Sequence, residues 1–403
     1  MDEAWGALRR RGGTAVFLCV LVWRLVAGWL WRDWPEYAGR WALLSGGVLL
    51  YVLALLWRGL PENRRAGETA VLPTLGLGNS LTLYRGLATA LLAGFLFSPW
   101  PGGFLAWLPA LLYMTADIAD YLDGYAARVA NHATRLGERL DMEYDGLSVL
   151  IVTLLAVWYG QLPLWYLPLG LARYLFLLGL WWRERRKLPV YDLPPSVHRR
   201  VFAGFQMGFL SAVLWPIVPP AGATIAGALF GAATAASFGR DWLVASGRLD
   251  PSTLAYRLWQ RRVVVATTVW LPLPLRLALA ACLGWIAASG PAPAWAGLLA
   301  GWGLPAAPLL ANVALAALVG AGTAVFLGIL PRVLTLPLVF PIGFDILTRG
   351  LVWPNGLALA CAIALMLLGS GPFSLWRPEE RFMARRAGES SIVNRQSSIA
   401  NCQ

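Results

Sequence analysis

The sequence has few of the residues that cover a water-soluble surface or build a soft-metal site. Only 13% of its 403 residues are charged, whereas 58% are hydrophobic. This balance excludes a water-soluble globule, because too little polar surface exists to cover one. The chain has only two histidines and four cysteines, and no two cysteines have CxxC spacing. A zinc site or a disulfide framework is therefore not expected.

Long apolar stretches recur from one end of the chain to the other. Roughly ten to twelve of them approach the length that crosses about 30 Å of hydrocarbon. The basic residues, which give a formal charge of +12, form short clusters between these stretches. They do not follow one face, so we expect no nucleic-acid partner. The clusters instead mark cytoplasmic loops, which predicts a multi-pass protein of a prokaryotic plasma membrane with its site facing the cytoplasm.

The apolar stretches fall into blocks. We expect an N-terminal transmembrane hairpin in residues 1–66, a six-helix core in 67–240, a linker or interfacial helix in 241–262, a C-terminal bundle of about four helices in 263–387 and a disordered tail in 388–403. The fold class is therefore an all-α polytopic membrane protein. Its apolar helices are predicted near residues 14–31, 41–57, 79–98, 103–128, 137–159, 163–182, 200–217, 221–238, 271–289, 307–330, 333–348 and 352–369.

Four aspartates stand within 26 residues of the predicted core, in the stretch DYLDGYAARVANHATRLGERLDMEYD. Carboxylates are costly in a membrane protein unless they are paired or bind a cation. At about 100° per residue, Asp123, Gly124, Ala127 and Arg128 lie within roughly 80° of Asp120 on one helix. On the next helix, Gly137, Asp141 and Asp145 share a face in the same way. The short polar turn between the helices makes them neighbours.

Converging carboxylates repel one another unless cations neutralise them. Oxygen ligands without histidine or cysteine select Mg²⁺ or Mn²⁺ rather than zinc. The pattern therefore predicts two such ions, which together can clamp a pyrophosphate. Small residues on the same faces let a ligand lie against the backbone, and Arg128 can pair with a phosphate oxygen.

This pattern, D-xx-D-G-xx-A-R-x8-G-xxx-D-xxx-D, resembles the signature of the CDP-alcohol phosphatidyltransferases. The upstream run Asn79-Ser80-Leu81-Thr82-Leu83-Tyr84-Arg85 resembles the N-x-L-T-x-x-R run that opens the first core helix of that family. The resemblance implies a six-helix core that transfers a phosphatidyl or other phospho-alcohol group from a CDP-linked donor to a hydroxyl acceptor and releases CMP. CDP-diacylglycerol is one such donor, and the reaction belongs to phospholipid biosynthesis.

The resemblance also implies roles for individual residues. Four carboxylates would hold the two metals, and the last would also be the general base: Asp120, Asp123, Asp141 and Asp145. The nucleotide site would comprise Asn79, Thr82, Gly124, Ala127, Arg128 and Gly137. Basic residues on later helices would recognise the acceptor, with Arg173, Arg183 and Arg200 as candidates. Asp117 is expected to be an outer partner of the site. Membrane lipids and a second copy of the chain are further candidate partners.

Two other functions fit part of the pattern. An aspartate-rich, Mg²⁺-dependent prenyltransferase would need a second aspartate-rich motif on a distant helix, and none is present. A transporter or assembly factor on the same fold would be favoured if a ligand aspartate were missing, and none is. In the C-terminal block, the run Gly369–Leu375 resembles the close of DoxX-type membrane proteins. There, Asp345 and Arg349 are expected to form a local ion pair.

Overall fold

The protein is helical throughout the part that the structure describes. This computed structural model describes residues 2–130, 132–193, 197–371 and 373–378. Within these ranges the one β feature is an isolated bridge between Ile329 and Trp376. Each of the twelve predicted apolar segments coincides with a helix or a broken pair of helices. The predicted tail at 388–403 lies outside the described residues.

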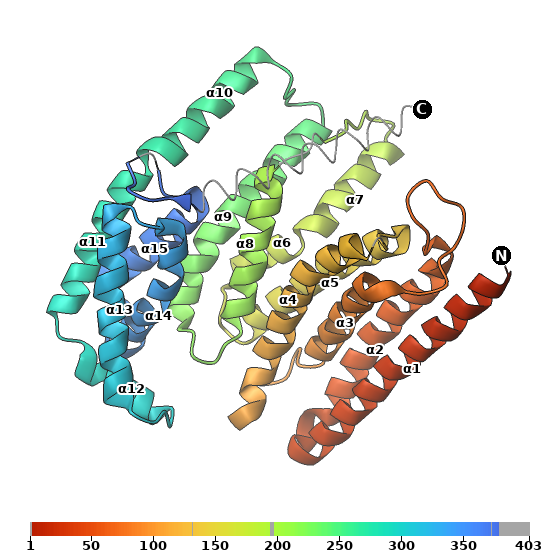
Figure 1. The fold of residues 1–403 in the computed structure, drawn as a ribbon, viewed down its shortest axis with the longest axis horizontal. Coiled ribbons are helices and arrows are strands. Elements are labelled where there is room, and N and C mark those ends of the chain that lie inside the picture. The colour runs from red at the N-terminus through yellow and green to blue at the C-terminus, as the bar shows by residue number, and fades with distance from the viewer. Residues whose placement is uncertain (1, 131, 194–196, 372, 379–403) are drawn as a thin grey trace. The chain divides into compact units, whose positions relative to one another are not determined.

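The helices follow one another with short connections (Figure 1). Their bounds are α1 Asp2–Asp33, α2 Pro35–Gly59, α3 Gly76–Ala93, α4 Leu108–Val129, α5 Arg135–Trp158, α6 Leu167–Gly170, α7 Ala172–Arg185, α8 Val197–Val213, α9 Pro220–Ala245, α10 Leu254–Val265, α11 Pro272–Ala288, α12 Ala292–Gly301, α13 Ala307–Leu327, α14 Pro331–Arg349 and α15 Trp353–Leu368. Short 3₁₀ turns lie at Leu60–Glu62, Gly103–Trp107 and Leu164–Tyr166, and a π segment at Ala266–Trp270.

The described helices divide into two compact units. The first comprises residues 1–174 and 207–217, and the second comprises 175–206 and 218–403. This division does not follow the predicted blocks, since α9 packs against α14 and α15 inside the second unit. The predicted division into hairpin, core, linker, C-terminal bundle and tail therefore stays a prediction.

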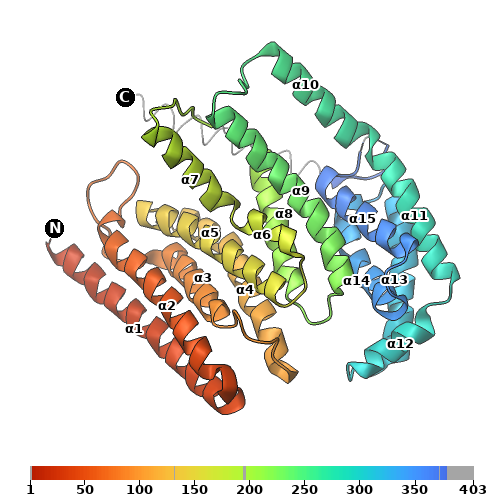
Figure 2. The ribbon, with the colours of Figure 1, turned by 180° about the vertical axis from the view of Figure 1, so that it is seen from behind.

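Helix α3 is the central helix of the first unit. It packs against α2, α4 and α5, while α1 packs against α2 (Figures 1 and 2). From Arg85 to Ala93 every residue of α3 is buried. A side chain that projects from the middle of α3 is therefore enclosed by its neighbours, and this position is where the candidate site forms.

The three helices α2, α3 and α5 approach closely at Gly86. A Cβ atom at this position would lie 2.8 Å from both Tyr144 of α5 and Val52 of α2. The buried hydroxyl of Tyr144 donates a hydrogen bond to the Val52 carbonyl at 2.9 Å. Glycine permits this approach because it has no side chain. The contact fixes α5, which carries two of the four aspartates, against the central helix.

The second unit contains the C-terminal bundle. Helix α15 packs against α11 and α14, and α13 packs against α11, α12 and α14. Within α14, the fully buried Asp345 pairs with Arg349 at 3.1 Å, which confirms the predicted ion pair. The Asn355 amide donates to the same carboxylate at 3.0 Å. These contacts close the turn between the two helices.

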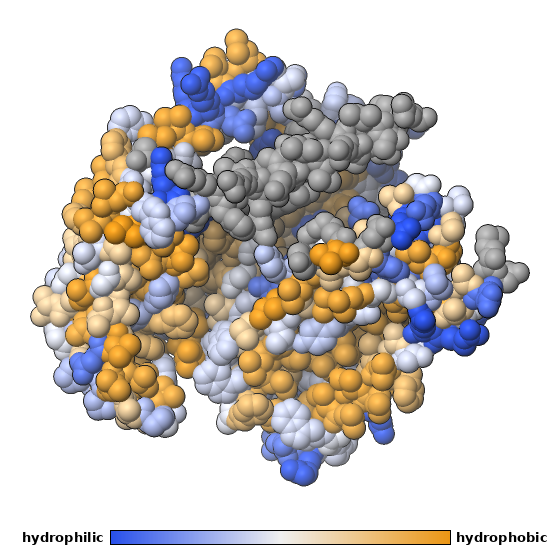
Figure 3. Space-filling model, in the orientation of Figure 1, coloured by the Kyte–Doolittle hydropathy of each residue, from blue (hydrophilic) through white to orange (hydrophobic). Residues whose placement is uncertain are grey.

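The chain is an all-α polytopic membrane protein. Six helical stretches are long and apolar enough to span a membrane: 3–33, 35–62, 220–245, 254–288, 307–327 and 331–349. Large apolar side chains such as Phe17, Leu25 and Leu43 are exposed on them. Much of the visible face is accordingly apolar (Figure 3). Helices α3, α4 and α5 are not among the six, since they carry the polar and charged residues of the candidate site.

Two features of the backbone differ from the sequence expectation. The segment predicted near 163–182 is broken into α6 and α7, which are bent by 57°. At the break, Gly170 lies so close to α5 that a Cβ atom would be 2.7 Å from Thr153. The second difference is α12, which is absent from the predicted segments. Its ten residues are too few to span a membrane, so its length did not predict a helix.

Candidate active site

The site forms around Arg85, which projects from the middle of α3 and is 3% exposed. Its Nη1 atom lies 2.7 Å from Asp120, 3.1 Å from Asp123 and 2.5 Å from Asp141. Its Nη2 atom pairs with Asp145. The four aspartates predicted as a cluster therefore converge, and the structure places an arginine at their centre.

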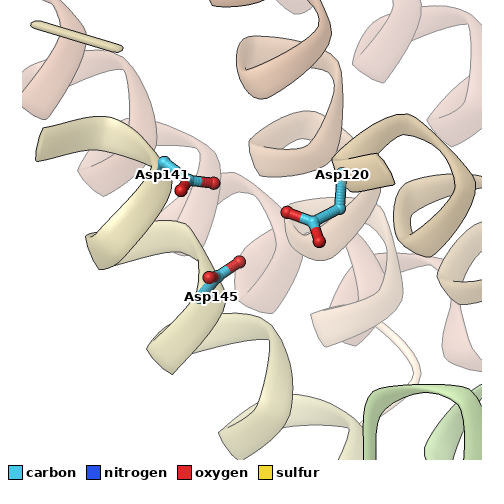
Figure 4. A group of neighbouring side chains, drawn as sticks. All are labelled: Asp120, Asp141 and Asp145. Carbon is cyan, nitrogen blue, oxygen red and sulfur yellow. The ribbon is translucent and has the colours of Figure 1, made fainter. Parts of the chain in front are cut away.

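Three of the carboxylates form a group that could share an ion. Oxygen atoms of Asp120, Asp141 and Asp145 all lie within 4.8 Å of one another. Figure 4 shows Asp120 from α4 facing Asp141 and Asp145 from α5. Their side chains are 32%, 41% and 36% exposed, so the group is open to incoming ligands. A donor set made only of carboxylate oxygens suits a hard divalent cation such as Mg²⁺ or Mn²⁺.

Asp123 differs from the other three, because its side chain is only 10% exposed. The hydroxyl of Thr82 donates to its Oδ2 atom at 2.9 Å, and Arg85 donates to the same atom. Both partners come from α3. Thr82, which the sequence assigns to the nucleotide site, here orients a predicted metal ligand.

The small residues of the motif lie where helices meet. A Cβ atom at Gly78 of α3 would be 2.9 Å from the Ala127 Cβ of α4 and 3.1 Å from the Asp123 carbonyl. Ala127 thus takes part in the close contact between α3 and α4. Gly124 is half-buried one residue after Asp123. Arg128 belongs to α4, but its side chain lies outside the described part of the structure.

Asn79 and Gly137 meet at the start of α5. The Asn79 amide donates to Asn63 and to the Thr134 hydroxyl, both at 3.0 Å. Thr134 is the N-cap of α5 and accepts a bond from the Gly137 backbone at 3.1 Å. Any side chain at Gly137 would collide with the Asn79 amide. The structure therefore uses Asn79 to hold the beginning of α5, and a contact of Asn79 with a nucleotide stays a prediction.

A small cavity of about 10 Å³ lies next to Arg85 and is lined by residues of α3, α4, α5 and α8. Asp117 lines it and accepts a hydrogen bond from Ser211 of α8 at 2.9 Å. The buried hydroxyl of Tyr113 also lies at this cavity without a hydrogen-bond partner among the described residues. Asp117 thus lines the same cavity as Arg85, and its role as an outer partner of the site stays a prediction.

Among the described ion pairs, neither Arg173 nor Arg183 contacts the four aspartates. Arg173 packs against Gly146, with its Cδ atom 2.7 Å from the position of a Cβ there. At about 100° per residue, Gly146 faces away from the stripe of Asp141 and Asp145. Arg183 donates to the carbonyls of Pro189 and Ser246. The side chain of Arg200 lies outside the described part. A role of these residues in acceptor binding stays a prediction.

Arg85 is the site residue that the sequence assignment left out. It ends the run Asn79–Arg85, whose Asn79 and Thr82 were assigned to the nucleotide. The available signal was its location within an apolar helix, where an unpaired arginine is costly. Such an arginine is expected to face the nearest acids, which are the aspartates of the following two helices.

Comparison with known proteins relates the site to a family. Residues 75–239 match the family model described as CDP-alcohol phosphatidyltransferase. This segment of the chain is similar to that family. It contains all of α3, α4 and α5 and therefore the whole aspartate cluster. The predicted resemblance is thus confirmed over the core.

Mycobacterial proteins are similar over part of the chain. Proteins of Mycobacterium bovis and Mycobacterium tuberculosis named "Putative cardiolipin synthase" are 30% identical to the chain over 144 residues. The match covers 35% of this chain and 65% of the length of each relative. No solved structure matches the chain.

Proposed function

We propose that the protein transfers a phosphatidyl or other phospho-alcohol group from a CDP-activated donor to a hydroxyl acceptor and releases CMP. The convergence of Asp120, Asp123, Asp141 and Asp145 from two adjacent helices supports this function most directly. The match of residues 75–239 to the family model supports the same chemistry. CDP-diacylglycerol is the proposed donor, and phospholipid biosynthesis is the proposed process.

Two Mg²⁺ or Mn²⁺ ions, held by these four carboxylates, would supply positive charge against the donor pyrophosphate. The half-exposed Asp120, Asp141 and Asp145 can reach a ligand from solvent, whereas the buried Asp123 is held by Thr82. The fixed α3 contacts hold the four carboxylates in position before substrates arrive, which lowers the cost of assembling the site.

In the proposed reaction, an acceptor oxygen forms a bond to the β-phosphorus while the bond to the CMP oxygen breaks. Asp145 takes the proton of the acceptor hydroxyl, and CMP leaves with the electrons of the broken bond. Asp145 is accessible for this role because its side chain is 36% exposed. The in-line geometry requires donor and acceptor to bind on opposite sides of the phosphorus.

CMP release by the purified protein tests this function. The assay combines CDP-diacylglycerol and Mg²⁺ with glycerol 3-phosphate, an inositol phosphate, serine or phosphatidylglycerol. Phosphatidylglycerol is included because the mycobacterial relatives bear the name cardiolipin synthase. We expect CMP release with one acceptor, and its loss in Asp141→Asn but not in the control Glu138→Gln. Glu138 is an exposed acid on the same helix, outside the cluster. Release of CMP by Asp141→Asn at the wild-type rate would contradict the proposal.

We also propose that the site faces the cytoplasm of a prokaryotic cell. The arginine clusters near Arg64 and Arg185 support this orientation through the positive-inside rule. Cysteines introduced at the exposed Glu68 and Arg186, in a chain without native cysteines, should resist membrane-impermeant thiol reagents in intact cells. Labelling of both positions from outside would reverse the orientation. A homodimer stays a proposal, and crosslinking in membranes tests it.

A further inference from the structure

The contacts of Arg85 are unusual for an arginine. A guanidinium nitrogen of the Nη type carries two hydrogens, yet Nη1 of Arg85 faces three carboxylates at 2.5, 2.7 and 3.1 Å. At least one of these contacts therefore lacks a hydrogen of its own. An arginine that binds a carboxylate by design usually uses two parallel hydrogen bonds. Several oxygens that converge on one positive atom are instead typical of ligands around a metal ion.

The charges around Arg85 are not balanced. Four carboxylates surround one guanidinium, so the group carries a net charge of −3 when all four are ionised. Among the described ion pairs, Arg85 is the one cation that these aspartates contact. Buried or half-buried charges of one sign repel strongly at such short distances. The cluster therefore favours the binding of further positive charge.

The four carboxylates also differ in how tightly α3 holds them. Asp123 is buried and has a second partner in Thr82. Asp120, Asp141 and Asp145 are half-exposed, and ligand oxygens of the three lie within 4.8 Å of one another. Opposite ligands of a single Mg²⁺ are about 4.2 Å apart, twice the Mg–O distance. The guanidinium thus keeps these three carboxylates convergent at a spacing similar to that of ligands around a divalent ion.

We propose that Arg85 is the counter-cation of the metal-free site and competes with divalent cations for Asp120, Asp141 and Asp145. Arg85 keeps the carboxylates together before metal binds and withdraws from these three when metal binds. It stays beside Asp123, which Thr82 also holds. This inference rests on the proposed function, because it assumes that the cluster binds metal. Arg85 is then a positioning residue whose own charge limits the affinity of the site.

The test measures Mn²⁺ affinity by titration of the full chain in detergent, and the melting temperature with EDTA and with Mn²⁺. In Arg85→Met, the dissociation constant for Mn²⁺ should fall by about tenfold or more, because a like charge within about 4 Å of the ion is removed. Its melting temperature should fall in EDTA and recover in Mn²⁺. Mn²⁺ should therefore raise the melting temperature more in the variant than in the wild type.

Arg85→Lys provides a second variant if Arg85→Met does not fold. It keeps the charge but replaces the five-donor fork by one ammonium group. It should also bind Mn²⁺ more tightly than the wild type, by a smaller factor. The matched control is Arg276→Met, which removes an arginine that is likewise 3% exposed but contacts carbonyl oxygens. This control should lower the melting temperature equally with EDTA and with Mn²⁺, and leave the Mn²⁺ affinity unchanged.

The outcomes separate this inference from the proposed function. Weaker Mn²⁺ binding in both Arg85 variants would show that Arg85 holds the ligands in place rather than competing with metal. This outcome would overturn the inference but not the proposed function. If the wild type binds no Mn²⁺ or Mg²⁺, the proposed metal site itself is wrong. Tighter binding in Arg276→Met would show that the effect is not specific to the cluster and would also overturn the inference.

Discussion

Among the described residues, two arginines are deeply buried, and their settings differ. Arg85 in the first unit is surrounded by four carboxylates, whereas Arg276 of α11 in the second unit is surrounded by neutral oxygens. Arg276 donates to the carbonyls of Val325 at 2.9 Å and of Phe326 and Phe373 at 2.6 Å. Val325 and Phe326 are in the last turn of α13, where helical carbonyls lack intrahelical donors.

The difference shows that burial alone does not identify a functional charge. At Arg276, each guanidinium nitrogen donates to a neutral acceptor and the arginine completes a helix end, which is a structural role. At Arg85, hydrogen bonds are crowded and negative charge is in excess, so the arrangement can take up cations. The chemistry of the groups that contact the arginine, carboxylates or carbonyls, distinguishes a candidate active site from a structural contact.

The largest expected difference is between an aspartate of the cluster around Arg85 and a buried aspartate of the second unit. Asp145→Asn should reduce CMP release by more than tenfold while the protein remains folded, since the change removes one charge and almost no volume. Asp345→Asn in the second unit should instead keep the activity of each folded molecule. It should destabilise the protein by about 1–3 kcal/mol, because Arg349 loses its buried ionic partner. If Asp145→Asn kept more than a tenth of wild-type turnover, Asp145 would not be the base.

Removal of divalent metal should also affect the two settings differently. EDTA should abolish CMP release, and added Mg²⁺ or Mn²⁺ should restore it, whereas a zinc-selective chelator should have no effect. Hydrogen exchange should speed up in the parts of α4 and α5 near Asp120 and Asp145. It should not change near Arg276, whose partners are carbonyls. Equal changes in both regions, or loss of activity on removal of zinc alone, would contradict this comparison.

A smaller effect is expected from the hydroxyl group that orients Asp123. Thr82→Val keeps the shape of the side chain but removes its hydrogen bond to the Asp123 carboxylate. Partners of metal ligands typically contribute 10–100-fold to metal affinity, so we expect about tenfold weaker Mn²⁺ binding. Thr335→Val is the control, because Thr335 of α14 is fully buried and bonds only to the Arg332 carbonyl. Unchanged Mn²⁺ binding in Thr82→Val would mean that this hydrogen bond does not orient a ligand.

Much of this comparison could be predicted from the sequence. The spacing of Asp120, Asp123, Asp141 and Asp145 on two helical faces predicts their convergence, because helix periodicity fixes which residues share a face. The apolar stretches likewise predict the helices. The bend between α6 and α7 was not predictable from apolarity, because it depends on a close contact between Gly170 and Thr153 of another helix.

The hydrogen-bond partners of individual polar side chains could also not be predicted from the sequence. Asn79 is followed three residues later by Thr82, and both lie on α3, yet Asn79 contacts Thr134 and Thr82 contacts Asp123. A helical pattern gives the direction of a side chain but not the loop or helix that it meets. Arg85 was left out of the predicted site for the same reason. Its four partners become evident only when α3 is placed between α4 and α5.

The smallest predicted difference concerns two helical glycines. At Gly78 an added methyl group would lie 2.9 Å from the Ala127 Cβ and 3.1 Å from the Asp123 carbonyl, whereas at Gly284 of α11 nothing lies within 4 Å. Gly284→Ala should therefore be neutral or stabilise the protein by up to about 1 kcal/mol, through the higher helix propensity of alanine. Gly78→Ala should destabilise it by about 1–3 kcal/mol, because α4 must move away from α3.

The two glycine variants also test how tightly the site depends on helix packing. A shift of α4 would draw Asp120 and Asp123 away from Arg85, so Gly78→Ala should reduce CMP release severalfold as well as the melting temperature. Gly284→Ala should leave CMP release unchanged. If Gly78→Ala lowered the melting temperature but kept full activity and Mn²⁺ affinity, the aspartate cluster would tolerate movement of α4. The close contact between α3 and α4 would then serve stability alone, as Arg276 does in the second unit.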